Sequence, residues 1–287
     1  MKGKRFIVFL IAIFFVVSLG AVAGSWFLFR LYQTLPSLGQ MQNIEQSLVS
    51  KVFAKDGSLI HEFSVERRFW VSIDKIPVNL QNAVISIEDR MFFKHWGINI
   101  HRIFGAVLVN IVRHGYAQGA STLTQQLARN VYLTAESSLI RKIREILTAV
   151  QLESCYTKRE ILELYLNQVY LGAGVYGVEA ASEYYFNKHV SELDFNECTI
   201  LAGLIQLPER YRPDKAANIK RMTSRRNKVI QAMLDMKLID KETARQTAAI
   251  VIEAKHKVKK SGVGAYFTEM VRKYIADRYG DELLYHG

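Results

Sequence analysis

The chain has 287 residues, enough for one sizeable core or for one domain with accessory segments. It carries 38 Lys and Arg against 27 Asp and Glu, a formal net charge of +11. This excess indicates an anionic partner: nucleic acid, an anionic membrane surface or a phosphate-bearing substrate. The four prolines and 17 glycines argue against disorder and against a protein with many β-turns. Cys155 and Cys198 fit no metal-binding spacing and are interpreted as buried free thiols.

The N-terminal segment predicts the compartment. Residues 1–5 are basic and precede an uncharged apolar run over residues 6–29. As a helix of about 24 residues this run spans about 36 Å, enough to cross a hydrocarbon core of about 30 Å. The basic residues place residues 1–5 in the cytoplasm and the remaining chain on the outer, periplasmic face of the cytoplasmic (inner) membrane.

A cleaved signal peptide is the alternative interpretation of this segment, because Ala21-Val22-Ala23 has the form of a cleavage site. The apolar run continues beyond this site and is longer than the core of a typical signal peptide. A single-pass, uncleaved anchor is therefore favoured. A chain outside the membrane is not expected to bind nucleic acid.

Residues 30–75 are expected to form a juxtamembrane linker with short strands. Apolar residues alternate on either side of Asp56-Gly57, which is a strong signal for a β-hairpin. Residues 68–73 can add a third short strand. From Pro77 onward the periodicity becomes helical, and the sequence predicts a mainly α domain over residues 76–245.

The helices of this domain are predicted from periodicity and capping residues, at residues 77–88, 138–155, 161–169, 195–205, 218–236 and 241–249, and residues 119–132 are predicted to be a loop that leads into a helix with a polar start. A further helix is expected at 265–279. Thr157 and Glu160 form a capping-box pattern, and Asp194 with Ser191 is expected to cap the helix that begins at Phe195. Residues 97–114 are apolar on nearly all sides, which is typical either of a core helix or of a surface that enters the bilayer.

The segment 83–97 carries the strongest candidate for chemistry. Its first half has the pattern of a buried helix, and two carboxylates, Glu88 and Asp89, follow where that pattern ends. A carboxylate beside apolar residues such as Ile85 and Ile87 is partly desolvated, which suits proton transfer near neutral pH. Taken alone, two solvated residues at a helix end are the commoner explanation.

Two motif matches fail their structural tests. Gly172-Ala-Gly174-Val-Tyr-Gly177 matches the dinucleotide fingerprint G-x-G-x-x-G, but it follows a helical pattern instead of a strand. These glycines are interpreted as a tight loop between helices. Ser72-Ile-Asp-Lys75 matches the S-x-x-K of penicillin-recognising enzymes, but the partner motif K-T-G is absent.

A second carboxylate and a basic cluster complete the candidate site. Glu145 lies in a different apolar segment from Glu88, and basic and polar residues accompany the two: Arg129, Arg141, Lys142, Arg144, Ser121, Gln125, Gln126 and Asn130. Glycosyl chemistry commonly uses two carboxylates that flank a sugar carbon. A hydrolase must protonate its leaving oxygen, whereas a transferase that releases pyrophosphate needs positive charge on the departing phosphates. The basic cluster therefore favours phosphate departure.

The sequence resembles the peptidoglycan glycosyltransferase family (glycosyltransferase family 51), which occurs in monofunctional transglycosylases and at the N-terminal end of class A penicillin-binding proteins; the resemblance is to the 1A type. The five family motifs occur in order, at residues 88–97, 119–130, 141–145, 158–167 and 225–230. The resemblance covers about residues 50–240. Five ordered motifs make it highly specific.

This resemblance implies an enzyme that polymerises lipid II into glycan strands and releases undecaprenyl pyrophosphate. The lipid-linked glycan chain is the donor, the GlcNAc 4-hydroxyl of incoming lipid II is the acceptor, and the anomeric carbon is inverted. Glu88 would be the general base. Glu145 would position a substrate or assist the leaving pyrophosphate, with Mg²⁺ or another divalent cation as an option. No tightly bound cofactor and no certain metal site are expected.

The resemblance also assigns substrate contacts. Arg141 and Lys142 match the basic pair that contacts phosphate, and the family usually has Lys where this chain has Arg129, so the charge is kept with a different geometry. The remaining substrate-binding candidates are polar: Asp89, Ser121, Gln125, Gln126 and Asn130. Asp89 is also interpreted as a neighbour that orients or tunes Glu88. A chiefly structural role is expected for Glu163, Asn167, Arg225 and Arg226.

The family fold is a lysozyme-like, mainly helical head with a smaller jaw lobe that partly enters the membrane, which favours the membrane interpretation of residues 97–114. Lipid II, the lipid-linked glycan chain, the membrane and cell-wall synthesis proteins are the expected partners. Residues 246–287 resemble the start of a linker toward a transpeptidase domain, so a fragment of a bifunctional synthase is expected and no transpeptidase activity is assigned to these residues.

Two rival functions remain open. One is a lysozyme-like muramidase or lytic transglycosylase that cleaves finished peptidoglycan, and the other is a non-enzymatic, membrane-anchored scaffold for cell-wall synthesis. Arg129, Arg141 and Lys142 argue for the transferase, because only a pyrophosphate substrate requires them.

Overall fold

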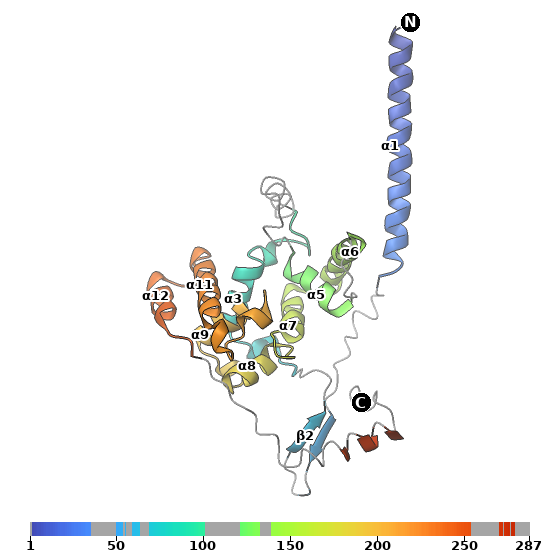
Figure 1. The fold of residues 1–287 in the computed structure, drawn as a ribbon. Helices are drawn as coiled ribbons and strands as arrows, with labels where there is room; N and C mark the ends of the chain where they lie inside the picture. Colours follow the sequence, from blue (N-terminus) through green and yellow to red (C-terminus); the bar gives the residue numbers. More distant parts are fainter. Residues whose placement is uncertain are drawn as a thin grey trace.

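The computed structural model describes residues 2–35, 50–53, 55, 59–63, 69–100, 121–132, 139–253, 270–271, 273–275 and 277–278. The described chain is mainly helical, which confirms the predicted fold class (Figure 1). Several expected features lie outside these residues: the proposed membrane-entering segment from residue 101 on, the Asp56-Gly57 turn, most of the linker and most of the C-terminal helix at 265–279.

Helix α1 (Lys2–Tyr32) leads away from the other described helices and includes one candidate membrane span, Phe9–Tyr32, with a mean hydropathy of 2.2 (Figure 1). Its large apolar side chains are exposed around the helix, as at Phe14 and Val16. A helix that is apolar on all sides and is not covered by protein has the length and composition that a hydrocarbon core requires. Leu31, near its end, is buried.

The predicted hairpin is confirmed. Strands β1 (Ser50–Phe53) and β2 (Leu59–Phe63) pair antiparallel, with Ser50 opposite Phe63 and an irregularity at Val52/Phe53.

The suggested third strand is wrong for the described residues 69–73, which form no strand. The side chain of Asn167 accepts from the N–H of Val71 (2.8 Å) and donates to its carbonyl (2.9 Å), and Glu163 accepts from the N–H of Ile73 (2.8 Å). Side chains of a helix therefore take the backbone groups that a sheet ladder would have used. This also confirms the structural roles expected for Glu163 and Asn167.

The helical body has two adjoining groups of helices (Figure 1). In one, α3 (Val78–Glu88) packs on α9 (Phe195–Leu204) and α11 (Ile219–Asp235), and α12 (Lys241–Ala249) packs on α11. In the other, α5 (Leu123–Tyr132) packs between α6 (Leu139–Cys155) and α7 (Lys158–Gln168). One continuous core of buried side chains joins both groups.

The helix boundaries follow from the capping residues. Thr157 and Glu160 form the predicted capping box at the start of α7, and Asp194 with Glu197 forms one at the start of α9. Pro77 directly precedes α3, where its missing N–H costs nothing. Two elements were not predicted from the sequence, α8 (Val178–Phe186) and the short α10 (Pro208–Tyr211).

The loop between α7 and α8 contains Gly172, Gly174 and Gly177, all with positive φ, which confirms its interpretation as a tight inter-helix loop. At Gly177 a Cβ would lie 2.6 Å from the carbonyl oxygen of Asn167, so the α7–α8 approach requires glycine. Both cysteines are free, and Cys198 is buried while Cys155 is partly exposed.

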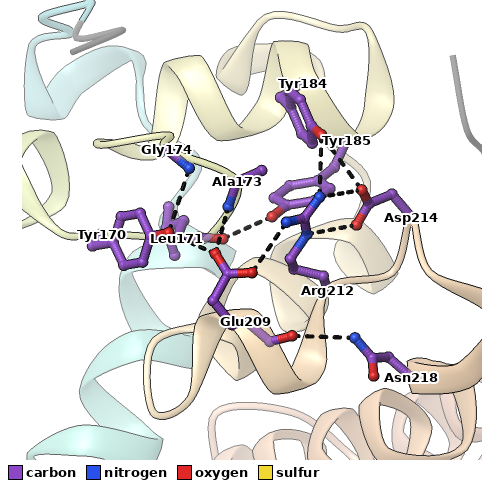
Figure 2. Close-up of polar contacts among 10 residues, drawn as sticks. All are labelled: Tyr170, Leu171, Ala173, Gly174, Tyr184, Tyr185, Glu209, Arg212, Asp214 and Asn218. Carbon is purple, nitrogen blue, oxygen red and sulfur yellow. Dashed lines mark hydrogen bonds and ion pairs between the residues drawn. The ribbon is translucent and has the colours of Figure 1, made fainter. Parts of the chain in front are cut away.

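A polar network fastens this loop to the segment around α10 (Figure 2). Glu209 accepts from the N–H of Ala173 (2.9 Å), the hydroxyl of Tyr170 (2.6 Å) and Arg212 (3.1 Å). Arg212 in turn donates to both carboxylate oxygens of Asp214, at 3.0 and 2.6 Å. We call Tyr170, Glu209, Arg212 and Asp214 the loop clamp.

Candidate active site

Glu88 is the last residue of α3, and its side chain is 13% exposed. Its Oε1 accepts from Nη2 of Arg225 on α11 at 3.0 Å, and its Oε2 accepts from Nε2 of Gln126 on α5 at 3.1 Å. Both partners are donors, and one of them is a guanidinium group, so the two contacts hold the carboxylate at the edge of the core. A carboxylate held in this way is a group that can serve as a general base.

Tyr165 of α7 lies behind Gln126 and is fully buried. Its hydroxyl donates to Oε1 of Gln126 at 3.0 Å. Burial raises the pKa of Tyr165 well above its ordinary value of 10.0, the negative charge of Glu88 raises it further, and Arg129 acts in the opposite direction. The phenol therefore keeps its proton at neutral pH.

Asp89 follows Glu88 but points to a different place. It is fully buried, and its Oδ2 accepts from the N–H of Leu123 (3.1 Å), the first residue of α5, and contacts Nε2 of His95 at 2.8 Å. A carboxylate at a helix N-terminus is favoured by the helix dipole. Asp89 thus joins the end of α3 to the start of α5. Because Asp89 is fully buried, the contacts that it makes here are with the chain itself, and its assignment to substrate binding stays a prediction.

Gln125 is also buried, and its assignment to substrate binding stays a prediction. It is 1% exposed, its Oε1 accepts from the N–H of Thr122 (3.0 Å), and its own N–H donates to Oγ1 of Thr122 (3.1 Å). These reciprocal bonds satisfy backbone donors at the start of α5, as in a capping box. The Thr122 hydroxyl also donates to the carbonyl of Gly97 at 2.6 Å. Gln125 therefore stabilises the start of α5 and is not available to a substrate in this structure.

A second cluster lies at the start of α5, and we call it the Lys142 cluster. Nζ of Lys142 donates to Oε1 of Glu145 (2.5 Å) and to Oγ of Ser121 (2.8 Å). The side chain of Glu145 is 1% exposed, whereas that of Lys142 is 42% exposed. The buried carboxylate of Glu145 and the hydroxyl of Ser121 thus fix the ammonium group of a lysine whose side chain is partly exposed.

The remaining predicted residues lie on α5 and α6. Asn130 is exposed, and Arg129 and Arg141 are partly exposed. Helix α5 is the link between the two parts of the site. Gln126 on this helix contacts Glu88, and Ser121, two residues before its start, contacts Lys142.

The sequence interpretation missed three residues of the site: Arg225, Tyr165 and His95. Arg225 was expected to be chiefly structural, but it pairs with Glu88 across 137 positions of sequence. The structural interpretation holds for Arg226, which is fully buried and donates to the carbonyls of Ala248 and Ile250. All three missed residues lie in segments that match family motifs, at residues 88–97, 158–167 and 225–230, and these motif positions were the signal in the sequence.

The described residues near Glu145 fit a resident divalent cation poorly. Mg²⁺ prefers oxygen ligands, whereas Glu145 is occupied by the ammonium group of Lys142. Among the described residues, the group of three potential ligands that lie within reach of one another is elsewhere, at Glu179, Glu183 and His189. The positive charge that the structure offers beside Glu145 is that of Lys142.

Residues 56–234 match the family model described as Transglycosylase. The chain is 38% identical over 286 residues to penicillin-binding protein 1A of Aquifex aeolicus, covering 99% of this chain and 38% of that protein. It is 36% identical over 283 residues to penicillin-binding protein 1A of Escherichia coli, covering 98% and 33%. The chain thus spans about a third of the length of these relatives.

A solved structure of penicillin-binding protein 1A from Haemophilus influenzae is 27% identical, covers 84% of this chain and 26% of that chain, and has a TM-score of 0.49. The matched range 56–234 includes both carboxylates, the Lys142 cluster and Arg225. The chain belongs to the transglycosylase family.

Proposed function

We propose that the chain is a membrane-anchored peptidoglycan glycosyltransferase that polymerises lipid II and releases undecaprenyl pyrophosphate. The family match supports the reaction class. The observation that carries the proposal is the pairing of two unlike groups across one short helix. A nearly buried carboxylate, Glu88, contacts Gln126 of α5, and the ammonium group of the partly exposed Lys142 contacts Ser121, two residues before that helix.

In the proposed reaction Glu88 accepts the proton of the acceptor 4-hydroxyl. The acceptor oxygen forms a bond to the anomeric carbon of the donor, and the bond from that carbon to the pyrophosphate oxygen breaks. The electron pair leaves with the phosphate, and attack from the opposite face inverts the configuration. No proton has to be supplied to the leaving group, because pyrophosphate departs as an anion.

Positive charge on the departing phosphates is the second requirement of this reaction. Lys142 supplies it from a position that Glu145 and Ser121 fix. Arg129 and Arg141 are accessible and can add charge from neighbouring turns of α5 and α6. Ser121, Gln126 and Asn130 offer polar contacts to the sugars.

The lipid-linked substrate also explains α1. An anchor that spans the membrane keeps the domain at the surface where a lipid-linked donor and acceptor are found. We propose that the N-terminus is cytoplasmic and that the catalytic residues face the outer side of the inner membrane, as the basic residues before the span favour. Other cell-wall synthesis proteins are the expected protein partners.

Labelled lipid II incubated with the purified protein in detergent tests the proposal. Wild type should form glycan polymer, and Glu88→Gln should lower kcat by about 10²–10⁴-fold, the usual contribution of a general base. Glu242→Gln is the matched control, because it makes the same change at an exposed carboxylate on α12. A wild type that makes no polymer, or an undiminished Glu88→Gln variant, contradicts the proposal.

The same assay with EDTA tests whether the reaction requires a divalent cation. Polymerisation that persists in EDTA would mean that the basic side chains alone stabilise the negative charge of the departing pyrophosphate. Activity that is lost in EDTA and restored by Mg²⁺ would assign part of it to an ion.

A further inference from the structure

Two hydrogen bonds connect Tyr165 to Glu88 through the side-chain amide of Gln126, and the donor and acceptor of each bond are fixed. An ionised carboxylate accepts hydrogen bonds and cannot donate them, so the group of Gln126 that faces Glu88 must be its NH₂. The carbonyl oxygen of the same amide then faces Tyr165, and the phenol must be the donor. Each link fixes the next, and the orientation of the amide follows from its two partners.

Tyr165 can act as the donor because its hydroxyl keeps its proton at neutral pH. The residue is fully buried, and burial together with the charge of Glu88 raises the pKa of its hydroxyl well above the ordinary value. Without this donor, the amide of Gln126 would lose the partner that holds its oxygen away from Glu88. A rotated amide would present its own oxygen to the carboxylate, which is repulsive.

Two donors from different helices then hold Glu88 from two sides. Arg225 approaches Oε1 from α11, and Gln126 approaches Oε2 from α5. The direction of the carboxylate matters, because a general base must lie within hydrogen-bond reach of the proton that it removes, and small misplacements are costly.

We infer that Tyr165 is a positioning residue for glycosyl transfer, which acts through Gln126 to hold the Glu88 carboxylate in the orientation that accepts the proton. This inference rests on the proposed function. It assigns to a residue of α7, remote from solvent, an effect on the rate of the chemical step.

The first test is Tyr165→Phe, which removes the hydroxyl and keeps the ring. We expect kcat for lipid II polymerisation to fall about tenfold, the effect of one lost hydrogen bond, while KM stays within about twofold. Tyr185→Phe is the matched control, because Tyr185 is also buried and donates its hydroxyl, to the carbonyl of Leu171 at 2.8 Å. Both variants should lose similar thermal stability, and only Tyr165→Phe should lose kcat.

A double-mutant cycle identifies the route. In a Gln126→Leu background the hydroxyl has no amide left to orient, so adding Tyr165→Phe should change kcat by less than about twofold. The inference is overturned if Tyr165→Phe retains full kcat, if Tyr185→Phe lowers kcat equally, or if the effects of Tyr165→Phe and Gln126→Leu simply multiply. If Tyr165→Phe does not fold, Gln126→Leu tests the link from its other end, and wild-type kcat in that variant overturns it.

These outcomes are distinct from a failure of the proposed function. If the wild-type protein makes no polymer from lipid II, the proposed function is contradicted. If the wild type polymerises lipid II and Tyr165→Phe is equally active, only the inferred role of Tyr165 is contradicted.

Discussion

Two glutamates of this chain contact arginine and other donors, yet their surroundings differ. Glu209 in the loop clamp accepts from a backbone N–H, a tyrosine and Arg212, and its side chain is 54% exposed. Glu88 accepts from Arg225 and Gln126, and its side chain is 13% exposed. Glu209 binds a main-chain N–H and thereby fixes the course of the loop. Glu88 joins side chains of α5 and α11 at the edge of the core, where the proposed function makes it the general base. An ion pair with arginine is common to both glutamates and does not by itself distinguish the two roles.

The largest expected effect comes from replacing each of these two glutamates, Glu88 and Glu209, with glutamine. Glu88→Gln should lower kcat by about 10²–10⁴-fold, because a neutral amide cannot accept the proton. It should also lower the thermal midpoint, because the nearly buried Arg225 loses the carboxylate charge that it contacts. Glu209→Gln should leave kcat unchanged. Kinetics on lipid II and thermal unfolding by circular dichroism measure the pair. A loss of catalysis in Glu209→Gln comparable to that in Glu88→Gln would erase the distinction.

Removal of the arginine that holds Glu88 is expected to have the next largest effect. Arg225→Met removes the guanidinium group that donates to the nearly buried carboxylate of Glu88, so we expect kcat to fall about 10–100-fold and the free energy of unfolding to fall by about 3 kcal/mol. Arg225→Lys should restore part of both, since it keeps the charge but loses the planar donor geometry. Chemical denaturation and steady-state kinetics test this. An Arg225→Met variant that loses stability but keeps kcat would place Arg225 with the structural residues.

A smaller effect is expected on thermal stability when the loop clamp is weakened. Glu209→Gln should lower the thermal midpoint by about 2–4 °C at pH 7, because the amide no longer pairs with Arg212 and accepts more weakly from the N–H of Ala173. Glu242→Gln, at an exposed ion pair on α12, should shift the midpoint by less. Equal shifts in the two variants would mean that the clamp adds nothing beyond an ordinary surface pair.

The smallest expected effect is the pH dependence of that shift. The hydroxyl of Tyr170, the N–H of Ala173 and the guanidinium of Arg212 lower the pKa of Glu209 from 4.5 to about 2 in the folded protein. A lowered pKa means that the stabilisation is fully present above pH 4.5 and is lost as the pH falls toward 2. The difference in midpoint between wild type and Glu209→Gln should therefore be constant from pH 7 to 5 and shrink below that. A difference that grows on acidification would contradict this.

Local signals in the sequence were sufficient for most helices. Thr157, Asp194 and Pro77 mark helix starts by their own chemistry, and the structure has helices where they predict them. The suggested third strand failed because its pattern is local, whereas its backbone partners are the side chains of Glu163 and Asn167, about 90 residues away.

The candidate site was predicted only in part, because local patterns can be recognised in the sequence and contacts between distant segments cannot. Glu88, Gln126 and the Lys142 cluster lie in short motifs that can be recognised one at a time. Arg225 and Tyr165 also lie in family motifs, but their contacts form only when α11 packs against α3 and α7 packs against α5, and a local motif does not show which side chain meets a distant carboxylate. Asp89 and Gln125 show the converse case. Their residue types suit substrate binding, and only their burial shows that they support the helix ends.

Helix α5 fixes the spacing between the two parts of the candidate site. Gln126 lies three positions after Leu123, the first residue of α5, which corresponds to about 4.5 Å of helix rise, and Ser121 lies two residues before Leu123. In the proposed reaction Gln126 holds the base that receives the acceptor proton, and Ser121 holds the ammonium group offered to the departing phosphate. One residue inserted between Leu123 and Gln126 would turn the Gln126 position by about 100° and move it by about 1.5 Å along the helix, so the first turn of one short helix sets the spacing of the two contacts.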